Sequence, residues 1–214
     1  MPLTRDYVDR KARVISNRKY SQKRFKYVLS RFRSSGKRLL VIGFGHPFEL
    51  ECSSHEGFEV IGLDRDWSAL SSASKQHFMV VATDASVGLP FHSDSFDLVL
   101  CHHVIEHIAD PDGFVREVCR VLDDDGVFVV ETPDLRFNKI FWGEPTHITP
   151  FTKDELIRLV SKYFEIQMSQ LFIPMVGIWR YSNLGFIVPN LLNLKKASVL
   201  VIGRKLVKET LRKP

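Results

Sequence analysis

The chain has 214 residues, of which 44% are hydrophobic and 26% charged, so it is long enough for one substantial core. We expect an ordinary globular protein with a single main domain rather than two equal domains. The charged opening, MPLTRDYVDRKARV, does not predict a secretory segment, and three cysteines without metal-type spacing fit a reducing, cytoplasmic location.

The net charge of +5 is distributed unevenly along the chain. Residues 1–38 carry thirteen Lys or Arg against two acids, and residues 185–214 carry seven against one, whereas the middle carries ten against twenty-two. The sequence therefore predicts an acidic domain with two basic ends. Such ends can meet nucleic acid, anionic lipid or the acidic surface of the domain itself, and a solvated helical face explains them equally well.

The first 35 residues predict a basic helical extension to a main domain at residues 36–214. Within the extension, QKRFKYVLSRF places apolar residues three and four positions apart, which gives a basic helix one apolar face. These apolar residues are Phe25, Val28, Leu29 and Phe32.

Short apolar runs alternate with helix-like segments from residue 38 onward. Nearly continuous apolar runs are typical of a parallel sheet that is covered by helices on both faces. We therefore predict a Rossmann-like, doubly wound α/β fold with its ligand site at the carboxyl ends of the strands. The runs are RLLVIGF (38–44), FEVIGLD (58–64), FMVVATD (78–84), FDLVLCH (96–102) and GVFVVET (126–132).

The pattern changes after Thr132. FTKDELIRLVSKYF has Thr152 as a helix N-cap and Glu155 three residues later, a capping box that opens an amphipathic helix. FEIQMSQLF and KASVLVIGRK then predict two more strands. Between them lies an apolar segment at about 171–196, in which prolines and an arginine interrupt any run long enough to span a membrane.

Three successive strand ends carry residues suited to binding a nucleoside. Gly43 and Gly45 in VIGFGHPF allow a tight turn that brings backbone N–H groups close to a ligand. Asp64 ends the second run, where a carboxylate can accept both hydroxyls of a ribose. Asp84 ends the third and can accept from an adenine amino group, with the backbone N–H of Ala85 beside it. Each feature alone has a structural explanation, but the three together favour a nucleoside site.

A dinucleotide dehydrogenase is the main competing interpretation, but the third small position of its G-x-G-x-x-G loop is Phe48 here. Over residues 38–165 the sequence instead resembles the class I S-adenosylmethionine-dependent methyltransferases, in particular the small-molecule branch with the ubiquinone-biosynthesis O-methyltransferases. The most specific element is LPF-x-x-x-SFD followed by EHI. The stretches that carry the resemblance are VIGFG, VIGLD, TDASVGLPFHSDSFDLVLCHHVIEHI, DPDGFVREVCRVLDDDGVFVVETPD and HITPFTKDELIRLV.

The resemblance implies a seven-stranded sheet whose last strand is antiparallel. It also implies S-adenosyl-L-methionine as the cofactor and S-adenosyl-L-homocysteine as the product. In the family, the first-strand loop holds the methionine part, the acid after strand two takes the ribose hydroxyls, and the acid after strand three meets the adenine. These roles fall on Gly43 and Gly45, on Asp64, and on Asp84.

Two positions depart from the family pattern. Val41 stands where the family usually has an acid that helps to hold the amino group of the cofactor. Pro47 stands where the family has a third glycine, so the loop is stiffer and lacks one backbone donor. Both departures predict weaker or differently arranged cofactor binding.

Histidines follow the fourth strand, beside the expected sulfonium. We predict that His102 contacts the cofactor and that His103 is the general base for a hydroxyl acceptor, because a free histidine titrates at roughly pH 6.5. If the next turn is helical, His103, Glu106 and His107 share one face and either brace the helix start or hold a metal. The related ubiquinone enzymes use E-x-x-E-H for a divalent metal, but His103 replaces the first acid, so no metal is predicted.

His147 in EPTHITPFTKDEL is the second candidate for the general base. The resemblance places this region over the acceptor, where a histidine commonly faces the substrate pocket. The structural alternative is a loop histidine that is hydrogen-bonded to backbone.

The sequence therefore predicts methyl transfer to a hydroxyl, or to an amine or carboxylate, of a small or lipid-linked acceptor. Two alternatives remain open: a methyltransferase-fold binding or scaffold protein without turnover, and an RNA methyltransferase that uses the basic arm. The apolar segment at about 171–196 is expected to pack in the core, to cover the acceptor or to contact a membrane surface from the cytoplasm. The oligomeric state is not predicted.

Overall fold

A computed structural model describes residues 28–29, 32, 37–136, 144–172 and 198–206 of the chain. The expected basic extension and the apolar segment at about 171–196 lie almost entirely outside these residues. In the described part of the chain, no helix is long and apolar enough to cross a bilayer.

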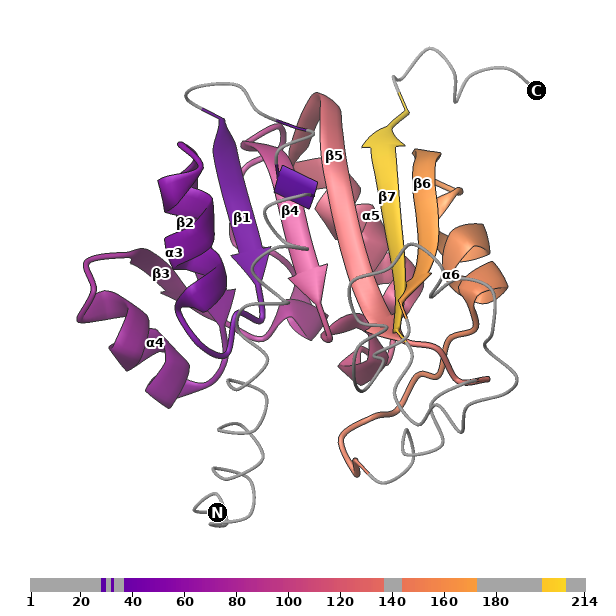
Figure 1. Ribbon diagram of the computed structural model, residues 1–214, viewed down its shortest axis with the longest axis horizontal. Coiled ribbons are helices and arrows are strands. Elements are labelled where there is room, and N and C mark those ends of the chain that lie inside the picture. The colour runs from indigo at the N-terminus through magenta and orange to yellow at the C-terminus, as the bar shows by residue number, and fades with distance from the viewer. Residues whose placement is uncertain (1–27, 30–31, 33–36, 137–143, 173–197, 207–214) are drawn as a thin grey trace, which may run out of the picture.

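Seven strands form one sheet in the order β3-β2-β1-β4-β5-β7-β6 (Figure 1). The strands from β3 to β5 pair in parallel, whereas β7 runs antiparallel to both of its neighbours. The predicted doubly wound sheet with an antiparallel last strand is therefore confirmed. The strands are β1 (Arg38–Ile42), β2 (Glu59–Asp64), β3 (Met79–Ala82), β4 (Phe96–His102), β5 (Leu122–Pro133), β6 (Phe164–Phe172) and β7 (Ser198–Lys205).

Helices cover both faces of the sheet (Figure 1). On one face, Leu50 of α3 packs in a core cluster with Val41 of β1. On the other, Phe114 of α5 packs in a cluster with Ile42, the next residue along β1, because side chains alternate across a strand. The helices are α3 (Phe48–His55), α4 (Trp67–Ser74), α5 (Pro111–Val121) and α6 (Lys153–Val160).

Local sequence signals set where these elements begin. Thr152 and Glu155 form the predicted capping box in front of α6. Asp66 caps α4 by accepting from the backbone N–H of Ser68. Strand β1 ends at Ile42, two residues earlier than predicted, because Gly43 turns the chain with a φ of +68°.

The described residues of the N-terminal segment pack on the face that α3 covers. Val28 and Leu29 are buried in the cluster that contains Val41, and Phe32 packs against it while partly buried. Three of the four predicted apolar residues therefore join the core. Phe25 lies outside the described residues.

The order in which the chain adds strands reverses at β1, which lies between β2 and β4. From β1 the chain proceeds outward through β2 to β3, and then returns to β4 on the other side. In open parallel sheets, ligands bind at the carboxyl ends of the strands beside such a switch point. We therefore expect the ligand site at the turns that follow β1, β2, β3 and β4.

Candidate functional site

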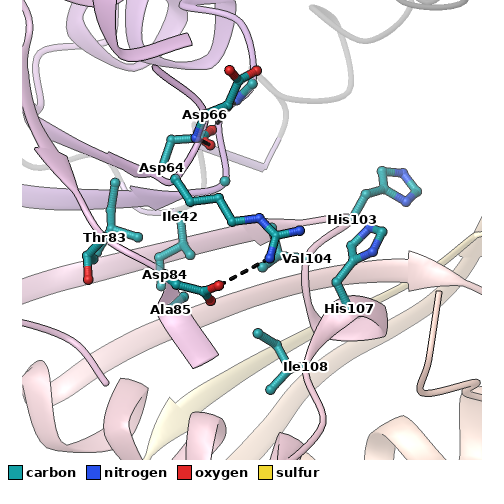
Figure 2. A pocket seen from close by; sticks show the side chains of 14 residues that line it. Ile42, Asp64, Asp66, Thr83, Asp84, Ala85, His103, Val104, His107 and Ile108 are labelled. Atoms are coloured by element: carbon teal, nitrogen blue, oxygen red, sulfur yellow. Dashed lines mark hydrogen bonds and ion pairs between the residues drawn. The ribbon is translucent and has the colours of Figure 1, made fainter. Parts of the chain in front are cut away.

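A pocket lies at this switch point and draws on the turns after all four strands (Figure 2). Nearly all of the residues that line it immediately follow or end a strand. The pocket is lined by Ile42, Gly43, Gly45, Leu63, Asp64, Arg65, Asp66, Thr83, Asp84, Ala85, His103, Val104, His107 and Ile108.

The first turn depends on two glycines for different reasons. Both have positive φ angles, +68° at Gly43 and +55° at Gly45, which other residues adopt only with strain. A Cβ at Gly43 would clash with the side chain of Val104, whereas a Cβ at Gly45 would meet nothing within 4 Å. Gly43 thus packs against the turn after β4, and Gly45 borders open space. Pro47 takes the N-cap position of α3, at a helix start where proline is tolerated.

Asp64, at the end of β2, is tied to the glycine turn. Its Oδ2 accepts from the backbone N–H of Gly45 at 2.8 Å, and its Oδ1 accepts from that of Asp66 at 2.9 Å. The side chain is buried, yet it lines the pocket. Because each carboxylate oxygen has two acceptor sites, both oxygens retain the capacity to accept from a hydroxyl.

Asp84 follows β3 and caps the 3₁₀ turn Ala85–Val87. Its Oδ1 accepts from the backbone N–H of Ser86 at 2.9 Å, and its Oδ2 accepts from the guanidinium of Arg65 at 3.1 Å. The hydrogen bonds from Ser86 and then the bond and charge of Arg65 hold the pKa of Asp84 below its ordinary value. Asp84 is therefore a carboxylate that caps the local turn and also lines the pocket, so it can have both a structural and a ligand-binding role. Arg65, which sequence reasoning missed, was detectable as the neighbour of Asp64.

His103 lies across the pocket from Asp64 and Asp84 (Figure 2). It leaves β4 with a φ of +55°, in the left-handed region. Its Nδ1 lies 3.3 Å from Oε1 of Glu106, and its Nε2 lies 3.7 Å from Oε1 of Glu131. Both glutamates are buried, so a half-exposed imidazole is placed between two acids. No sequence pattern pointed to Glu131.

The helical face expected for His103, Glu106 and His107 does not form. A single 3₁₀ turn covers Ile105–His107, and His103 precedes it in the left-handed conformation. His103 still contacts Glu106, but His107 continues toward the loop that contains Thr146. The condition for the shared face is therefore not met, because the left-handed His103 precedes the helical turn.

Glu106 connects the histidine side of the pocket to the protein core. Its Oε2 accepts from the hydroxyl of Thr132 at 3.0 Å, and its backbone carbonyl accepts from the N–H groups of Ile148 and Thr149. Burial raises the pKa of Glu106. The hydrogen bond and charge of His103 have the opposite effect, and the net shift of the pKa is downward. Glu106 is thus a buried carboxylate that a neighbouring histidine keeps ionised.

His107 and His147 lie side by side beyond Glu106. The Nδ1 of His107 donates to the carbonyl of Thr146 at 2.8 Å, and the two rings are 4.9 Å apart. His107 lines the pocket, whereas His147 is not among its lining residues. The structure therefore brings His103 and His107 to the pocket and places His147 behind them.

Potential metal-ligand atoms of Glu106, His107 and His147 lie within 4.8 Å of one another. In the metal group considered from the sequence, the third member was His103 instead of His147. The carboxylate of Glu106 is engaged at both oxygens, by His103 and by Thr132. A hard cation such as Mg²⁺ prefers oxygen ligands, of which this group offers only that carboxylate. The group fits such a cation poorly, and we assign no step to one.

His102, the last residue of β4, is hydrogen-bonded to Glu49 in the first turn of α3. Its Nδ1 lies 2.8 Å from Oε1 of Glu49, and both side chains are largely buried. His102 is not among the pocket-lining residues, although His103 and Val104 are. Glu49 was missed because no local pattern connects two residues 53 positions apart.

Comparison with known families agrees with this arrangement. Residues 40–130 match the family described as "Methyltransferase domain". This part of the chain is a methyltransferase domain. A solved structure of a SAM-dependent methyltransferase from Archaeoglobus fulgidus has the same fold, with a TM-score of 0.66 at 20% identity over 88% of this chain and 94% of that one.

Curated relatives of the methyltransferase domain have related names. A Mycobacterium tuberculosis protein named "Probable S-adenosylmethionine-dependent methyltransferase" is 31% identical over 150 residues, which are 65% of this chain and 53% of the relative. A "Ubiquinone biosynthesis O-methyltransferase" of Psychrobacter arcticus is 30% identical over 111 residues, 46% of this chain and 41% of the relative. The chain thus spans about half the length of the curated relatives it matches. The predicted resemblance is confirmed.

S-adenosylmethionine is the cofactor that the methyltransferase domain implies, and the pocket fits it at the adenosine end. Asp64 and Asp84 present carboxylates from neighbouring strand ends, and the space beside Gly45 is open. The fit at the other end differs from the family pattern, because Val41 is fully buried in the core and offers no polar group.

Proposed function

We propose that the chain transfers a methyl group from S-adenosylmethionine to a hydroxyl group of a small or lipid-linked acceptor. One observation carries the proposal: Asp64 and Asp84 line one side of the pocket, and His103, which is hydrogen-bonded to the buried Glu106, lines the opposite side (Figure 2). The relatives named as ubiquinone O-methyltransferases support a hydroxyl rather than an amine or a carboxylate as the acceptor group.

When bound, S-adenosylmethionine supplies a methyl group on a positively charged sulfur. Asp64 would accept from the ribose hydroxyls, since its two oxygens are fixed by backbone donors and retain acceptor capacity. Asp84 would accept from the adenine amino group, with the backbone of Ala85 beside the ring. Gly45 leaves room for the ligand to approach the backbone. Such alignment is the main task of the protein in a direct displacement.

His103 would take the proton from the acceptor hydroxyl. Glu106 bonds its Nδ1 and so fixes the orientation of the ring, and a carboxylate at that position stabilises the imidazolium that forms. The Nε2 lies 3.7 Å from Oε1 of Glu131, and His103 lines the pocket, so we assign to Nε2 the proton of the methyl-accepting hydroxyl. His147 is the second candidate, although His107 lies nearer to the pocket.

The first test is calorimetric titration of the full chain with S-adenosylmethionine and, separately, S-adenosylhomocysteine. Replacing Asp64 with Ala should weaken both affinities about tenfold or more, because two hydrogen bonds to a charged group are lost. Glu59→Gln, at an exposed position, serves as the control because it removes one negative charge, as Asp64→Ala does. An affinity that is unchanged in Asp64→Ala would remove the proposed role of this residue.

The second test measures transfer of radiolabelled methyl from S-adenosylmethionine to catechols, hydroxybenzoates and polyprenyl phenols, with total RNA as a parallel substrate. We expect label in the hydroxyl acceptors, lost in His103→Asn while S-adenosylhomocysteine affinity is kept. Label in RNA alone would favour the RNA methyltransferase alternative. Tight cofactor binding without any transfer would favour a binding protein without turnover.

A further inference from the structure

The residue at position 41 cannot serve the amino group of the cofactor in this chain. Val41 is fully buried, in the core cluster that includes Leu29 and Leu50. A carboxylate there would be taken from water into an apolar layer without a partner, which is strongly unfavourable. The acid that the family usually has at this position is therefore excluded by the packing of α3 and the N-terminal segment against β1.

A different carboxylate lies on the same face of the sheet and at its ligand edge. Glu49 is in the first turn of α3, next to Leu50, which packs against Val41. Its side chain reaches His102, the residue that directly precedes the pocket-lining His103. The partial positive charge of a helix N-terminus favours an anion at this position.

The hydrogen bond to His102 holds Glu49 in place and leaves part of it available. A carboxylate only accepts hydrogen bonds, so Nδ1 of His102 carries the shared proton. Oε1 of Glu49 accepts it, and Oε2 bonds no residue in the described part of the chain. The side chain of Glu49 retains 21% of its exposure, and Glu49 lies next to the pocket rather than among the residues that line it.

Cys101, the residue before His102, lies near Glu49 as well. The buried Cys101 precedes His102 and pairs with Ile42, the last residue of β1. Burial raises the pKa of the Cys101 thiol, and the charges of Glu106 and Glu49 raise it further. Cys101 thus lies within the electrostatic reach of both acids, one on each side of the β4 end.

We propose that Glu49 binds the α-ammonium group of S-adenosylmethionine, in place of the acid that Val41 has replaced, and that His102 is the positioning residue that orients it. This inference rests on the cofactor part of the proposed function. It assigns the methionine end of the cofactor to the part of the pocket that Gly45 and His103 border. The adenosine end stays with Asp64 and Asp84.

Three ligands separate the two ends of the cofactor in calorimetric titrations. S-adenosylhomocysteine carries the amino and carboxyl groups, S-adenosyl-3-thiopropylamine keeps only the amino group, and 5′-methylthioadenosine has neither. Glu49→Gln should weaken binding of the first two about tenfold or more and leave 5′-methylthioadenosine within about twofold. Glu51→Gln, in the same helical turn, is the matched control and should change none of the three.

The positioning role of His102 has its own readout. His102→Gln should weaken the two amino-containing ligands less than Glu49→Gln does, because the carboxylate remains but is no longer held. In the double variant, the effect of His102→Gln should disappear. Thermal unfolding of each variant checks that the fold is intact.

Several outcomes would overturn the inference. Equal weakening of all three ligands in Glu49→Gln would indicate a structural role, and no weakening would indicate no role. Equal affinity of the unaltered chain for 5′-methylthioadenosine and S-adenosylhomocysteine would show that the methionine end gains nothing, while leaving the adenosine site in place. Only a chain that binds none of the ligands would also remove the proposed function.

Discussion

The aspartate side and the histidine side of the pocket are built by different means. Asp64 and Asp84 each accept from a backbone N–H two residues further along, and the second oxygen of each accepts from a residue 19 positions earlier, Gly45 or Arg65. On the histidine side, Glu106 bonds Thr132, 26 residues away, and His107 bonds Thr146, 39 residues away. The aspartate side is therefore held by its own turns and by the neighbouring strand end, whereas the histidine side also requires β5 and the loop before α6.

The largest expected effect is at Gly43, where the two sides touch. Gly43→Ala should lower the free energy of unfolding by about 2–4 kcal/mol, because the new Cβ would clash with Val104 in a strained backbone conformation. Denaturant unfolding measures the loss. Since Val104 lies beside His103, cofactor binding should weaken as well.

Gly45→Ala is the matched control for this prediction. Its Cβ would enter open space, so the cost to stability should be only the strain of a positive φ, about 1–2 kcal/mol. S-adenosylhomocysteine affinity should nevertheless fall, because the methyl group enters the pocket. If both variants lost equal stability, the contact between Gly43 and Val104 would not connect the two sides.

The next effect concerns Glu106 on the histidine side. Glu106→Gln should lower the free energy of unfolding by about 1–3 kcal/mol near neutral pH, because a charge-assisted bond with His103 is lost from a buried site. The exposed Glu59→Gln should change it by less than about 0.5 kcal/mol.

The difference in the free energy of unfolding between the unaltered chain and Glu106→Gln should also depend on pH. The folded-state pKa of Glu106 lies below its unfolded value, so its stabilising contribution is present above the unfolded pKa. It is lost as the pH falls through the folded pKa. The two stability curves should therefore converge under acid conditions. A gap that stayed constant down to the acid transition would mean that Glu106 is not ionised in the folded protein.

The smallest effect is expected on the aspartate side. Arg65→Ala removes the ion pair with Asp84, but these side chains are 61% and 39% exposed, and such pairs contribute less than about 1 kcal/mol. The difference in stability should vanish in high salt, which screens exposed charges. A large loss that persists in salt would show that Arg65 stabilises the fold by more than an exposed ion pair.

The sequence predicted the elements that depend on local signals. The apolar runs located all seven strands, and the pair Thr152 and Glu155 correctly marked the start of α6. Asp64 and Asp84 were found because parallel strands end at one edge, so position along the chain was sufficient to bring them together.

The remaining features depend on contacts that no local pattern encodes. His103 adopts a left-handed conformation and lies between the carboxylates of Glu106 and Glu131, which are 25 positions apart in the chain. Glu49 is a common kind of residue for the first turn of a helix, and only the pairing of β1 with β4 brings it to His102. The departures at Val41 and Pro47 were visible in the sequence, but the contact between Glu49 and His102 was not.

The position of β7 has a consequence for synthesis of the chain. It lies between β5 and β6, so until residues 198–205 have left the ribosome β5 has one unpaired edge and β6 has two. Unpaired edges can recruit strands of other chains. The switch-point turns, in contrast, belong to residues 42–108, which emerge before β7. The nascent protein can therefore assemble the edge that forms the pocket first, and the opposite side of the sheet remains exposed to mispairing until β7 has been synthesised.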